Sequence, residues 1–412
     1  MNMNSLVLTE IKTSGNIVEY SYSVAGEWSR FFSGSDTFFI EYDFPLDDVP
    51  EGVLAIPFLC NILPISWVSN AEINVPAIDH DFLKSIPEFK QGYIDMYPMI
   101  NFEGTMLVGQ VERNEGIRSG CASLFSGGAD SIHTMISHLD EGPALICIWG
   151  ADVCLDDEGG WKRVKTHLIE TAGDYDFDYT TIKSSFRKVI DEDELSKYIS
   201  RSGDCWWHGF QHGIALIGHT APYMYANKLR TLYIASSFRI QDNVSIASHY
   251  SIDNFVRFAN SNVIHDGATH HRQEKIGEIC NYSDETGKKV SMRVCWQSIG
   301  GGNCSNCEKC FRTMLAITAE GHNPADYGFI WNKQVIRKVK YSILWRYSVF
   351  LRYGPIIERM RETIVTKKQK KQWRWLITRT PEQLDNTFGK KIFNCVRKTR
   401  IWRFIRTNMC NQ

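Results

Sequence analysis

The sequence lacks the long apolar segment that a membrane helix requires. Its most apolar stretch, GVLAIPFLCNILPISWV, is interrupted by Pro57, Asn61 and Pro64, whereas a membrane-spanning helix needs about 20 unbroken apolar residues. We therefore expect this stretch to form a buried strand and a loop. A second apolar stretch, YSILWRYSVFLRYGPII, contains Arg346 and Arg352 and does not predict a transmembrane segment either.

We also expect no secretory signal, because the first residues, MNMNSLVLTE, have neither a basic region nor an apolar region. Hydrophobic residues make up 43% of the chain and charged residues 23%, values that are typical of a globular protein. We expect a soluble, cytoplasmic protein.

Net charge is almost absent, at −1, but it is unevenly distributed. Residues 333–412 contain 21 Lys and Arg against 4 Asp and Glu, which leaves 25 against 43 for residues 1–332. An acidic body with a basic tail predicts either an anionic partner, such as a nucleic acid, or a tail that packs on its own body. The tail has amphipathic helical spacing and four tryptophans, a mixture found in nucleic-acid and membrane-surface segments and also in helical bundles. These tryptophans are Trp345, Trp373, Trp375 and Trp402.

Three parts are predicted along the chain. Strand-like alternation in NIVEYSYSV and DTFFIEYDF indicates a β-rich N-terminal domain over residues 1–115. From about residue 118 the pattern becomes strand, turn, helix, with ALICIWG and TLYIASS as strands and WWHGFQHGIALIGHTAPYMYANKL as a long apolar helix. This alternation predicts an α/β domain with a parallel sheet over residues 116–330. Residues 331–412 are expected to form a basic, aromatic, helical extension.

The stretch SLFSGGADSI follows a small apolar run and precedes helical spacing, so it predicts a strand-to-helix turn. Gly127 and Gly128 let the backbone turn tightly and approach a ligand. Their N–H groups, together with the positive end of the helix, form a nest for an anion such as pyrophosphate. The alternative is a plain Gly-Gly turn before a helix.

Three polar side chains belong to the same turn. Ser126 and Ser131 supply hydroxyl donors. Asp130 would repel a bare phosphate, so it indicates either a bound Mg²⁺ or a structural hydrogen bond across the turn.

A second cluster lies in VCWQSIGGGNCSNCEKCF. Four thiolates on one glycine-rich loop could form a tetrahedron around Zn²⁺. An iron–sulfur cluster uses the same ligands, and two disulfides are disfavoured by the missing export signal. The C-x8-C-x2-C-x2-C set consists of Cys295, Cys304, Cys307 and Cys310.

The turn resembles the PP-loop, Ser-Gly-Gly-x-Asp-Ser, of the ATP pyrophosphatases, which have a HUP-like parallel sheet. That resemblance implies cleavage of ATP to AMP and pyrophosphate, with AMP transferred to a carboxylate or carbonyl oxygen before a nucleophile displaces it. It implies an ATP-binding segment that consists of Leu124, Phe125, Ser126, Gly127, Gly128, Ala129, Asp130 and Ser131. Asp130 is the implied partner of the metal.

With the cysteine set some 170 residues later, residues 118–320 resemble the 7-cyano-7-deazaguanine synthase (QueC) family. That family uses ATP and ammonia to convert a 7-carboxy-7-deazaguanine to its nitrile, and its zinc is structural. The resemblance implies ATP, Mg²⁺ and Zn²⁺, and a deazaguanine or another small carboxylate as substrate. The extra N- and C-terminal parts suggest a protein partner, as in QueC-like proteins of anti-phage defence operons. A PP-loop sulfurtransferase acting on tRNA, and a non-catalytic nucleotide-binding scaffold, stay as alternatives.

Other polar residues are weaker candidates. Lys183 and Arg187 follow a predicted strand and could contact phosphates or a substrate carboxylate, although both types are usually ordinary surface residues. Candidates for a substrate-side loop are Ser236, His265, Asp266 and Arg272. The alternative there is a helix-capping aspartate with a solvated charged face. Three histidines of the apolar helix, His208, His212 and His219, are expected in the core or on the helix surface.

Overall fold

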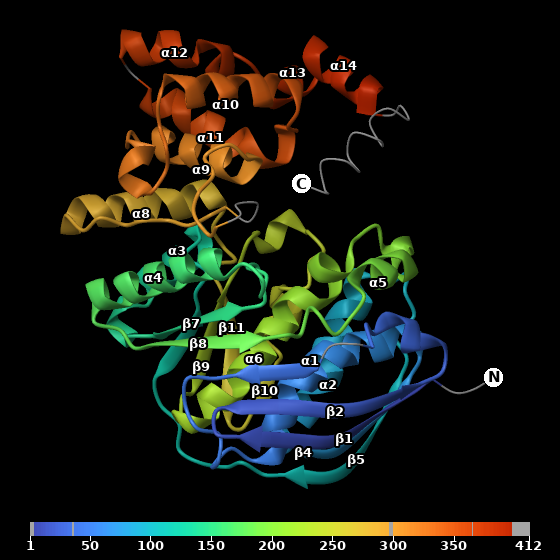
Figure 1. The fold of residues 1–412 in the computed structure, drawn as a ribbon. Helices are drawn as coiled ribbons and strands as arrows, with labels where there is room; N and C mark the ends of the chain where they lie inside the picture. The colour runs from blue at the N-terminus through green and yellow to red at the C-terminus, as the bar shows by residue number, and fades with distance from the viewer. Residues whose placement is uncertain (1–3, 35–36, 296–299, 365, 398–412) are drawn as a thin grey trace. The chain divides into compact units, whose positions relative to one another are not determined.

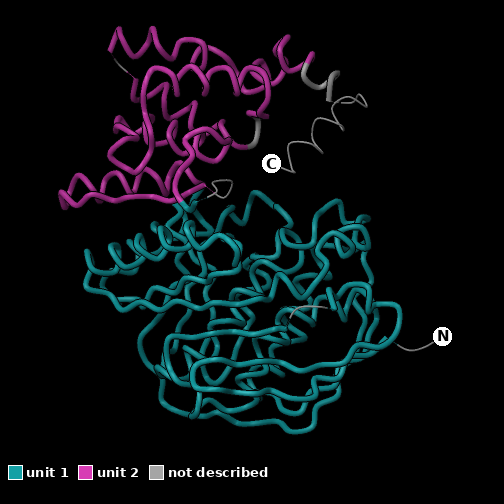
Figure 2. Tube along the Cα trace, in the orientation of Figure 1, with its two compact units in different colours: residues 1–271, 299–301 teal, residues 272–298, 302–412 magenta. Residues whose placement is uncertain are grey.

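The computed structural model divides into two compact units (Figures 1 and 2). Unit 1 contains residues 1–271 and 299–301, and unit 2 contains residues 272–298 and 302–412. The residues that the structure describes are 4–34, 37–295, 300–364 and 366–397. Unit 1 is built on a β-sheet, and unit 2 is helical.

The described residues of unit 1 form one sheet of eleven strands. The strands are β1 (Ser5–Ser14), β2 (Ile17–Ala25), β3 (Phe38–Glu41), β4 (Glu72–Asp79), β5 (Thr105–Glu112), β6 (Cys121–Leu124), β7 (Ala144–Trp149), β8 (Tyr179–Ser184), β9 (Thr231–Ala235), β10 (Arg257–Phe258) and β11 (Ser261–Asp266). Their order is β10-β11-β9-β6-β7-β8-β3-β2-β1-β4-β5. The run β11-β9-β6-β7-β8 is parallel throughout, whereas β3, β2 and β1 continue it with antiparallel pairs.

Helices connect these strands. They are α1 (Glu51–Ser69), α2 (His80–Met96), α3 (Ala129–Ser137), α4 (Glu158–Tyr175), α5 (Glu192–Tyr198), α6 (His212–Ala226) and α7 (Tyr250–Asp253). A short π-helix, Trp207–Gln211, leads into α6. The expected strands ALICIWG and TLYIASS and the long apolar helix are therefore present, and the prediction of an α/β fold with parallel strands is confirmed.

The pattern of buried and exposed residues in a strand shows whether one or both faces of the sheet are covered there. β7, ALICIW, is buried along nearly its whole length, as a parallel strand with both faces covered should be. In β2 the side chains of Val18 and Tyr20 are buried, whereas Glu19 and Ser21 are exposed, so one face of the sheet is open there.

The β-strands predicted near the N-terminus form, but they continue the central sheet. β3 pairs with β8 through Ile40 opposite Ser184. Residues 1–115 also contain α1 and α2.

The prediction of a strand and loop for the most apolar stretch is wrong, because residues 51–69 form α1. Pro57 and Pro64 lie inside this helix, and its residues from Gly52 onward are buried. A helix that is apolar all round is a core helix, and its packing outweighs the lost hydrogen bonds of two prolines. The polar side chain of Asn61 is also compatible with burial in this helix, because its amide donates to the Pro57 carbonyl oxygen at 2.8 Å.

Among the described residues, α1 is one helix that is long and apolar enough to cross a membrane by length and composition. Its whole apolar window is buried inside the protein. This burial is that of a core helix, so α1 gives no indication of a membrane protein.

Unit 2 is a helical bundle. Its helices are α8 (Arg272–Thr286), α9 (Glu308–Ala319), α10 (Lys333–Trp345), α11 (Phe350–Thr363), α12 (Lys367–Ile377), α13 (Pro381–Asp385) and α14 (Phe388–Arg397). The basic tail is thus helical, as predicted, and it buries Val339, Tyr353 and Trp373. The Arg359 guanidinium lies 2.8 Å from the Glu320 carboxylate and ties α11 to the end of α9. Trp402 lies outside the described residues.

Candidate functional site

The Ser-Gly-Gly-x-Asp-Ser segment is the turn between β6 and α3. The Phe125 N–H extends the pairing of β6 by donating to the Ile146 carbonyl oxygen at 2.7 Å. Gly127 then takes a φ of 72°, a left-handed conformation that side chains disfavour. Gly128 is the N-cap residue, and α3 begins at Ala129. A strand, a tight glycine turn and a nine-residue helix therefore follow one another.

Hydroxyl groups gather at the start of α3. The Gly128 N–H donates to Ser126 Oγ at 3.3 Å, and Ser131 Oγ donates to the Gly128 carbonyl oxygen at 3.1 Å. The two serine hydroxyls are 3.4 Å apart. Asp130 is half-buried in the first turn of the helix. The helix dipole favours a negative charge at this end, so Asp130 also stabilises α3 in the absence of a metal.

The strand order places this turn at a topological switch point. β7 lies on one side of β6 and β9 on the other, so the strand order reverses between β6 and β9. In open parallel sheets, ligands bind in the crevice at such a reversal, outside the carboxyl ends of the strands. The turn at Ser126 and the residue after β9, Ser236, lie at the carboxyl ends of these two neighbouring strands.

Ser236 and Asp266 are joined at this edge. The Ser236 N–H donates to the Asp266 carbonyl oxygen at 2.8 Å, and Ser236 Oγ donates to the Phe238 carbonyl oxygen. The Asp266 carboxylate accepts from Thr134 Oγ1 at 2.7 Å and lies 3.2 Å from His138 Nε2. Burial lowers the pKa of His138, but hydrogen bonds with Glu141 and Asp266 raise it overall. Asp266 therefore holds α3 against the end of β11.

His265 is separated from Asp266 by the alternation of side chains along β11. Its Nδ1 lies 2.8 Å from Asp253 Oδ2, which also accepts from Ser248 Oγ at 2.8 Å. His265 and Asp253 are both buried. The structure thus brings Asp266 to α3 and His265 to α7. Arg272 begins α8 in unit 2.

Lys183 and Arg187 lie at and beyond the end of β8, and both are engaged within unit 1. Arg187 makes a bidentate ion pair with Glu192, donates to the Ala151 carbonyl oxygen at 2.8 Å and covers the Trp207 ring. Burial lowers the pKa of Arg187, but its hydrogen bonds to Glu192 raise it overall. Lys183 Nζ lies 3.3 Å from the Glu41 carboxylate.

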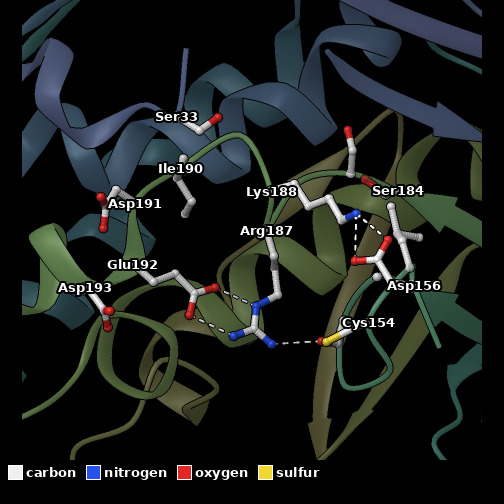
Figure 3. A pocket seen from close by; sticks show the side chains of 14 residues that line it. Ser33, Cys154, Asp156, Ser184, Arg187, Lys188, Ile190, Asp191, Glu192 and Asp193 are labelled. Carbon is white, nitrogen blue, oxygen red and sulfur yellow. Dashed lines mark hydrogen bonds and ion pairs between the residues drawn. The ribbon is translucent and has the colours of Figure 1, made fainter. Parts of the chain in front are cut away.

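A cavity of about 490 Å³ opens next to Arg187, beyond the ends of β7 and β8 (Figure 3). Lys188 reaches Asp156 there, with Nζ 2.8 Å from one carboxylate oxygen. The acidic side chains that line the cavity are Asp156, Asp191, Glu192 and Asp193. None of these four acidic residues is among the site residues predicted from the sequence. The sequence does contain a feature that could have indicated this acidic wall of the cavity. Acidic residues cluster after β7, in DVCLDDE, and after β8, in DEDE.

The four cysteines of the predicted metal set lie together in unit 2. All four Sγ atoms are within 4.8 Å of one another. Cys295 Sγ is 3.7 Å from Cys307 Sγ, and Cys304 Sγ is 3.9 Å from Cys310 Sγ. Four sulfurs about 2.3 Å from a central Zn²⁺ are about 3.8 Å apart in a tetrahedron, whereas a disulfide joins sulfurs at about 2.05 Å. The spacing therefore fits a metal, and no disulfide joins these four residues in the structure.

Backbone groups support the same loop. The Cys310 N–H donates to Cys307 Sγ at 3.5 Å, so Cys307 is the N-cap residue of α9. The Asn306 N–H donates to Cys304 Sγ at 3.4 Å. Hydrogen bonding from the Cys310 thiol, above all, lowers the pKa of Cys307 to about 5, which favours the thiolate that a metal requires.

No protein-family model matches the sequence, and no curated protein or solved structure matches it. The assignment of a function therefore depends on the residues of the chain itself.

Proposed function

We propose that this protein is an ATP-dependent, AMP-forming enzyme of the PP-loop type that activates a carboxylate for C–N bond or nitrile formation, as 7-cyano-7-deazaguanine synthase does. One observation carries the proposal. The Ser-Gly-Gly-x-Asp-Ser turn joins β6 to α3 beside the reversal of strand order between β6 and β9. This is where an α/β sheet binds anionic ligands, and the turn has the positive φ and the hydroxyl groups that a phosphate nest needs.

The chemistry follows from these groups. The N–H groups of the turn and the hydroxyls of Ser126 and Ser131 would bind the β and γ phosphates of ATP, which leaves the α phosphorus exposed. A substrate carboxylate oxygen attacks that phosphorus, the bond to the bridging oxygen breaks, and pyrophosphate departs. An amine or ammonia then attacks the acyl carbon, loses a proton and displaces AMP, which gives an amide. A nitrile requires a second ATP: the amide oxygen attacks its α phosphorus, pyrophosphate departs, and loss of AMP and a proton leaves the nitrile. Donors already in place stabilise the charge on pyrophosphate as it leaves.

Asp130 is the residue that would hold Mg²⁺ at the phosphates. It lies in the first turn of α3 within the segment that carries both serine hydroxyls. A carboxylate among oxygen ligands suits Mg²⁺, which neutralises phosphate charge.

Lys183 and Arg187 belong to the proposal as cations at the end of β8, which is separated from β6 by β7. Their present partners are Glu41 and Glu192. A phosphate or carboxylate that binds either cation would have to displace the corresponding glutamate. Ser236 and Asp266 would contribute to the substrate side of the same edge.

We further propose that the four-cysteine set binds one structural Zn²⁺. The proposal is supported by sulfur–sulfur distances of 3.7 and 3.9 Å, which suit a tetrahedron. Metal analysis tests it. About one zinc per chain and a colourless protein support zinc, whereas brown protein that contains iron and inorganic sulfide would assign an iron–sulfur cluster instead.

The reaction is tested by separating labelled adenine nucleotides after incubation with candidate substrates. These are 7-carboxy-7-deazaguanine with ammonia, and the same acid with the amine of a partner protein. We expect AMP and pyrophosphate in equal amounts. Release of ADP and phosphate would contradict the PP-loop assignment.

Asp130→Asn keeps the shape of the side chain and removes its charge. We expect turnover to fall about 100-fold with a much smaller change in nucleotide affinity. Asp140→Asn is the matched control, because Asp140 is exposed beyond the other end of α3, and it should keep full activity. Unchanged turnover in Asp130→Asn would remove Asp130 from the mechanism.

A further inference from the structure

Two adjoining helices of unit 2, α10 and α12, carry cations and no carboxylate. The helices adjoin because Lys340 Nζ of α10 lies 5.8 Å from the centre of the Trp375 ring of α12 (Figure 1). Their lysine and arginine side chains are all exposed, and we call them together the basic face. The basic face consists of Lys333, Arg337, Lys338 and Lys340 of α10 and Lys367, Lys368, Lys370, Lys371 and Arg374 of α12.

The charges of the basic face do not stabilise the helices that carry them. Lys367 and Lys368 occupy the first turn of α12, at the positive end of the helix dipole, where a cation is unfavourable. Lys367 and Lys371 are four residues apart, as are Lys370 and Arg374, and like charges at this spacing repel each other. Within the described part of the chain, the ion pairs of unit 2 use other lysines and arginines. This arrangement is that of charges which serve a ligand rather than the fold.

The apolar side of α12 is already used inside unit 2. Trp373 and Leu376 are buried, and the Trp373 ring stacks with that of Trp331. A helix that binds a membrane surface places its apolar side among the lipid chains, and in α12 the bundle covers that side. The basic face therefore offers charge without an apolar surface for insertion, which favours a polyanion in solution over a lipid bilayer.

Aromatic rings lie among these cations. Tyr341 of α10 is 60% exposed, and its ring stacks on that of Trp345 with the centroids 5.2 Å apart. Tyr341 follows Arg337 by four residues, so the two share a side of α10. On α12, the half-buried Trp375 follows Lys371 at the same spacing. An acidic protein needs cations alone, whereas a single-stranded nucleic acid presents phosphates together with unstacked bases, which stack on aromatic rings.

We propose that the basic face and Tyr341 bind a single-stranded nucleic acid. Its phosphates are neutralised by the cations of α10 and α12, and one of its bases packs on the exposed part of the Tyr341 ring. The bases of a duplex are already stacked on each other, so a duplex has only the phosphate contacts. The binding is separate from the AMP-forming reaction, because α10 and α12 belong to unit 2 and the Ser-Gly-Gly-x-Asp-Ser turn belongs to unit 1.

Fluorescence anisotropy of a labelled oligouridine of about 15 nucleotides, with the full-length protein and without ATP, is the first test. If about four phosphates are neutralised, the affinity should fall about 50-fold between about 50 and 200 mM salt. Lys370→Gln with Lys371→Gln should weaken binding about 10-fold and reduce this salt dependence. The melting temperature of this variant should not fall, because the removed charges repel their neighbours. Lys162→Gln with Lys165→Gln, on the exposed side of α4, is the matched control and should bind like the wild type.

The stacking contact is the second test. Tyr341→Ala should weaken binding of the oligouridine at least about 5-fold and leave the weaker binding of a duplex of equal length unchanged. Tyr341→Phe, which keeps the ring, should bind like the wild type.

Two competitors distinguish the partner from other anions. Neither polyglutamate nor phosphatidylserine vesicles, added at the same concentration of charge, should displace the oligouridine. Displacement by either one, equal affinity for the single strand and the duplex, or no binding at the lower salt concentration would overturn the proposal. Binding that is unchanged in the lysine variant or in Tyr341→Ala would overturn it as well.

Discussion

His219 shows what a single side chain does in the core of unit 1. Its ring lies in α6 and is completely buried. Nδ1 lies 2.6 Å from the Ala215 carbonyl oxygen and Nε2 lies 2.9 Å from Ser184 Oγ. The first contact requires an N–H at Nδ1, so Nε2 accepts from the serine hydroxyl. Burial of the ring lowers the pKa of His219 to about 4 from 6.5. The ring is therefore a neutral structural group, in agreement with its prediction as a core histidine.

The lowered pKa makes stability depend on pH. The unfolded chain takes up the proton near pH 6.5 and the folded chain only near pH 4, so acid favours unfolding across that window. Through this shift, His219 should lower the free energy of unfolding by about 2 kcal/mol when the pH falls from 7 to 5. In urea unfolding at both pH values, His219→Gln should show a smaller loss than the wild type. His208→Gln, at an exposed position beside Asp204, should behave like the wild type. If the wild type, His219→Gln and His208→Gln lost equal amounts of unfolding free energy between the two pH values, His219 would not be the group responsible.

At the scale of elements, close packing explains why residues 51–69 form a helix although their sequence pattern did not predict one. α1 lies against α6, where a Cβ atom on Gly218 would be 2.5 Å from the Cys60 Cβ. The absence of a side chain at Gly218 lets the two helices approach, and this contact helps to compensate for the prolines of α1.

The cysteine loop and α9 are a second place where the structure of an element depends on a contact outside the local sequence pattern. Cys307 is both a metal ligand candidate and the N-cap of α9, so metal binding and helix formation should be coupled. Cys307→Ser should lose the metal and lower the melting temperature of unit 2. Cys154→Ser, at an exposed cysteine of unit 1, should keep both the metal and the stability. A stable, metal-free Cys307→Ser protein would show that the site is not structural.

At the scale of the whole molecule, the basic tail is part of a folded unit. α11 packs on α9, and Thr363 Oγ1 donates to the Ala319 carbonyl oxygen. The stacked rings of Trp331 and Trp373 have centroids 6.3 Å apart. The aromatic residues of the described tail thus serve, at least in part, as the core of unit 2.

Removal of residues 333–412 should therefore damage unit 2 itself. Without residues 333–412 the apolar face of α9 that packs on α11, and Phe311, whose ring lies against Tyr347, would lose their cover, and exposed apolar patches of this kind cause aggregation. We expect a chain that ends at residue 332 to elute in the void volume and to lose its metal. A soluble, monodisperse truncated protein that retains metal would indicate that the tail is an independent arm.

Sequence alone predicted many of the local elements, although not α1, and it named the residues of both candidate sites. Alternating or continuous apolar residues predicted β2 and β7, and Ser-Gly-Gly-x-Asp-Ser placed a turn between β6 and α3, because hydrogen bonds and side-chain direction within a segment depend on neighbouring residues. The spacing of the four cysteines predicted a cluster for the same reason, since three of them lie within seven residues.

Only the tertiary structure decided how these elements combine. That Ile40 of β3 pairs with β8 and joins the N-terminal strands to the central sheet depends on contacts between residues more than 140 positions apart. Contacts between distant segments also turned the proline-containing stretch into a buried helix and brought Asp266 to Thr134 of α3. The free energy of each arrangement comes from burial and pairing between distant segments, which no local pattern encodes.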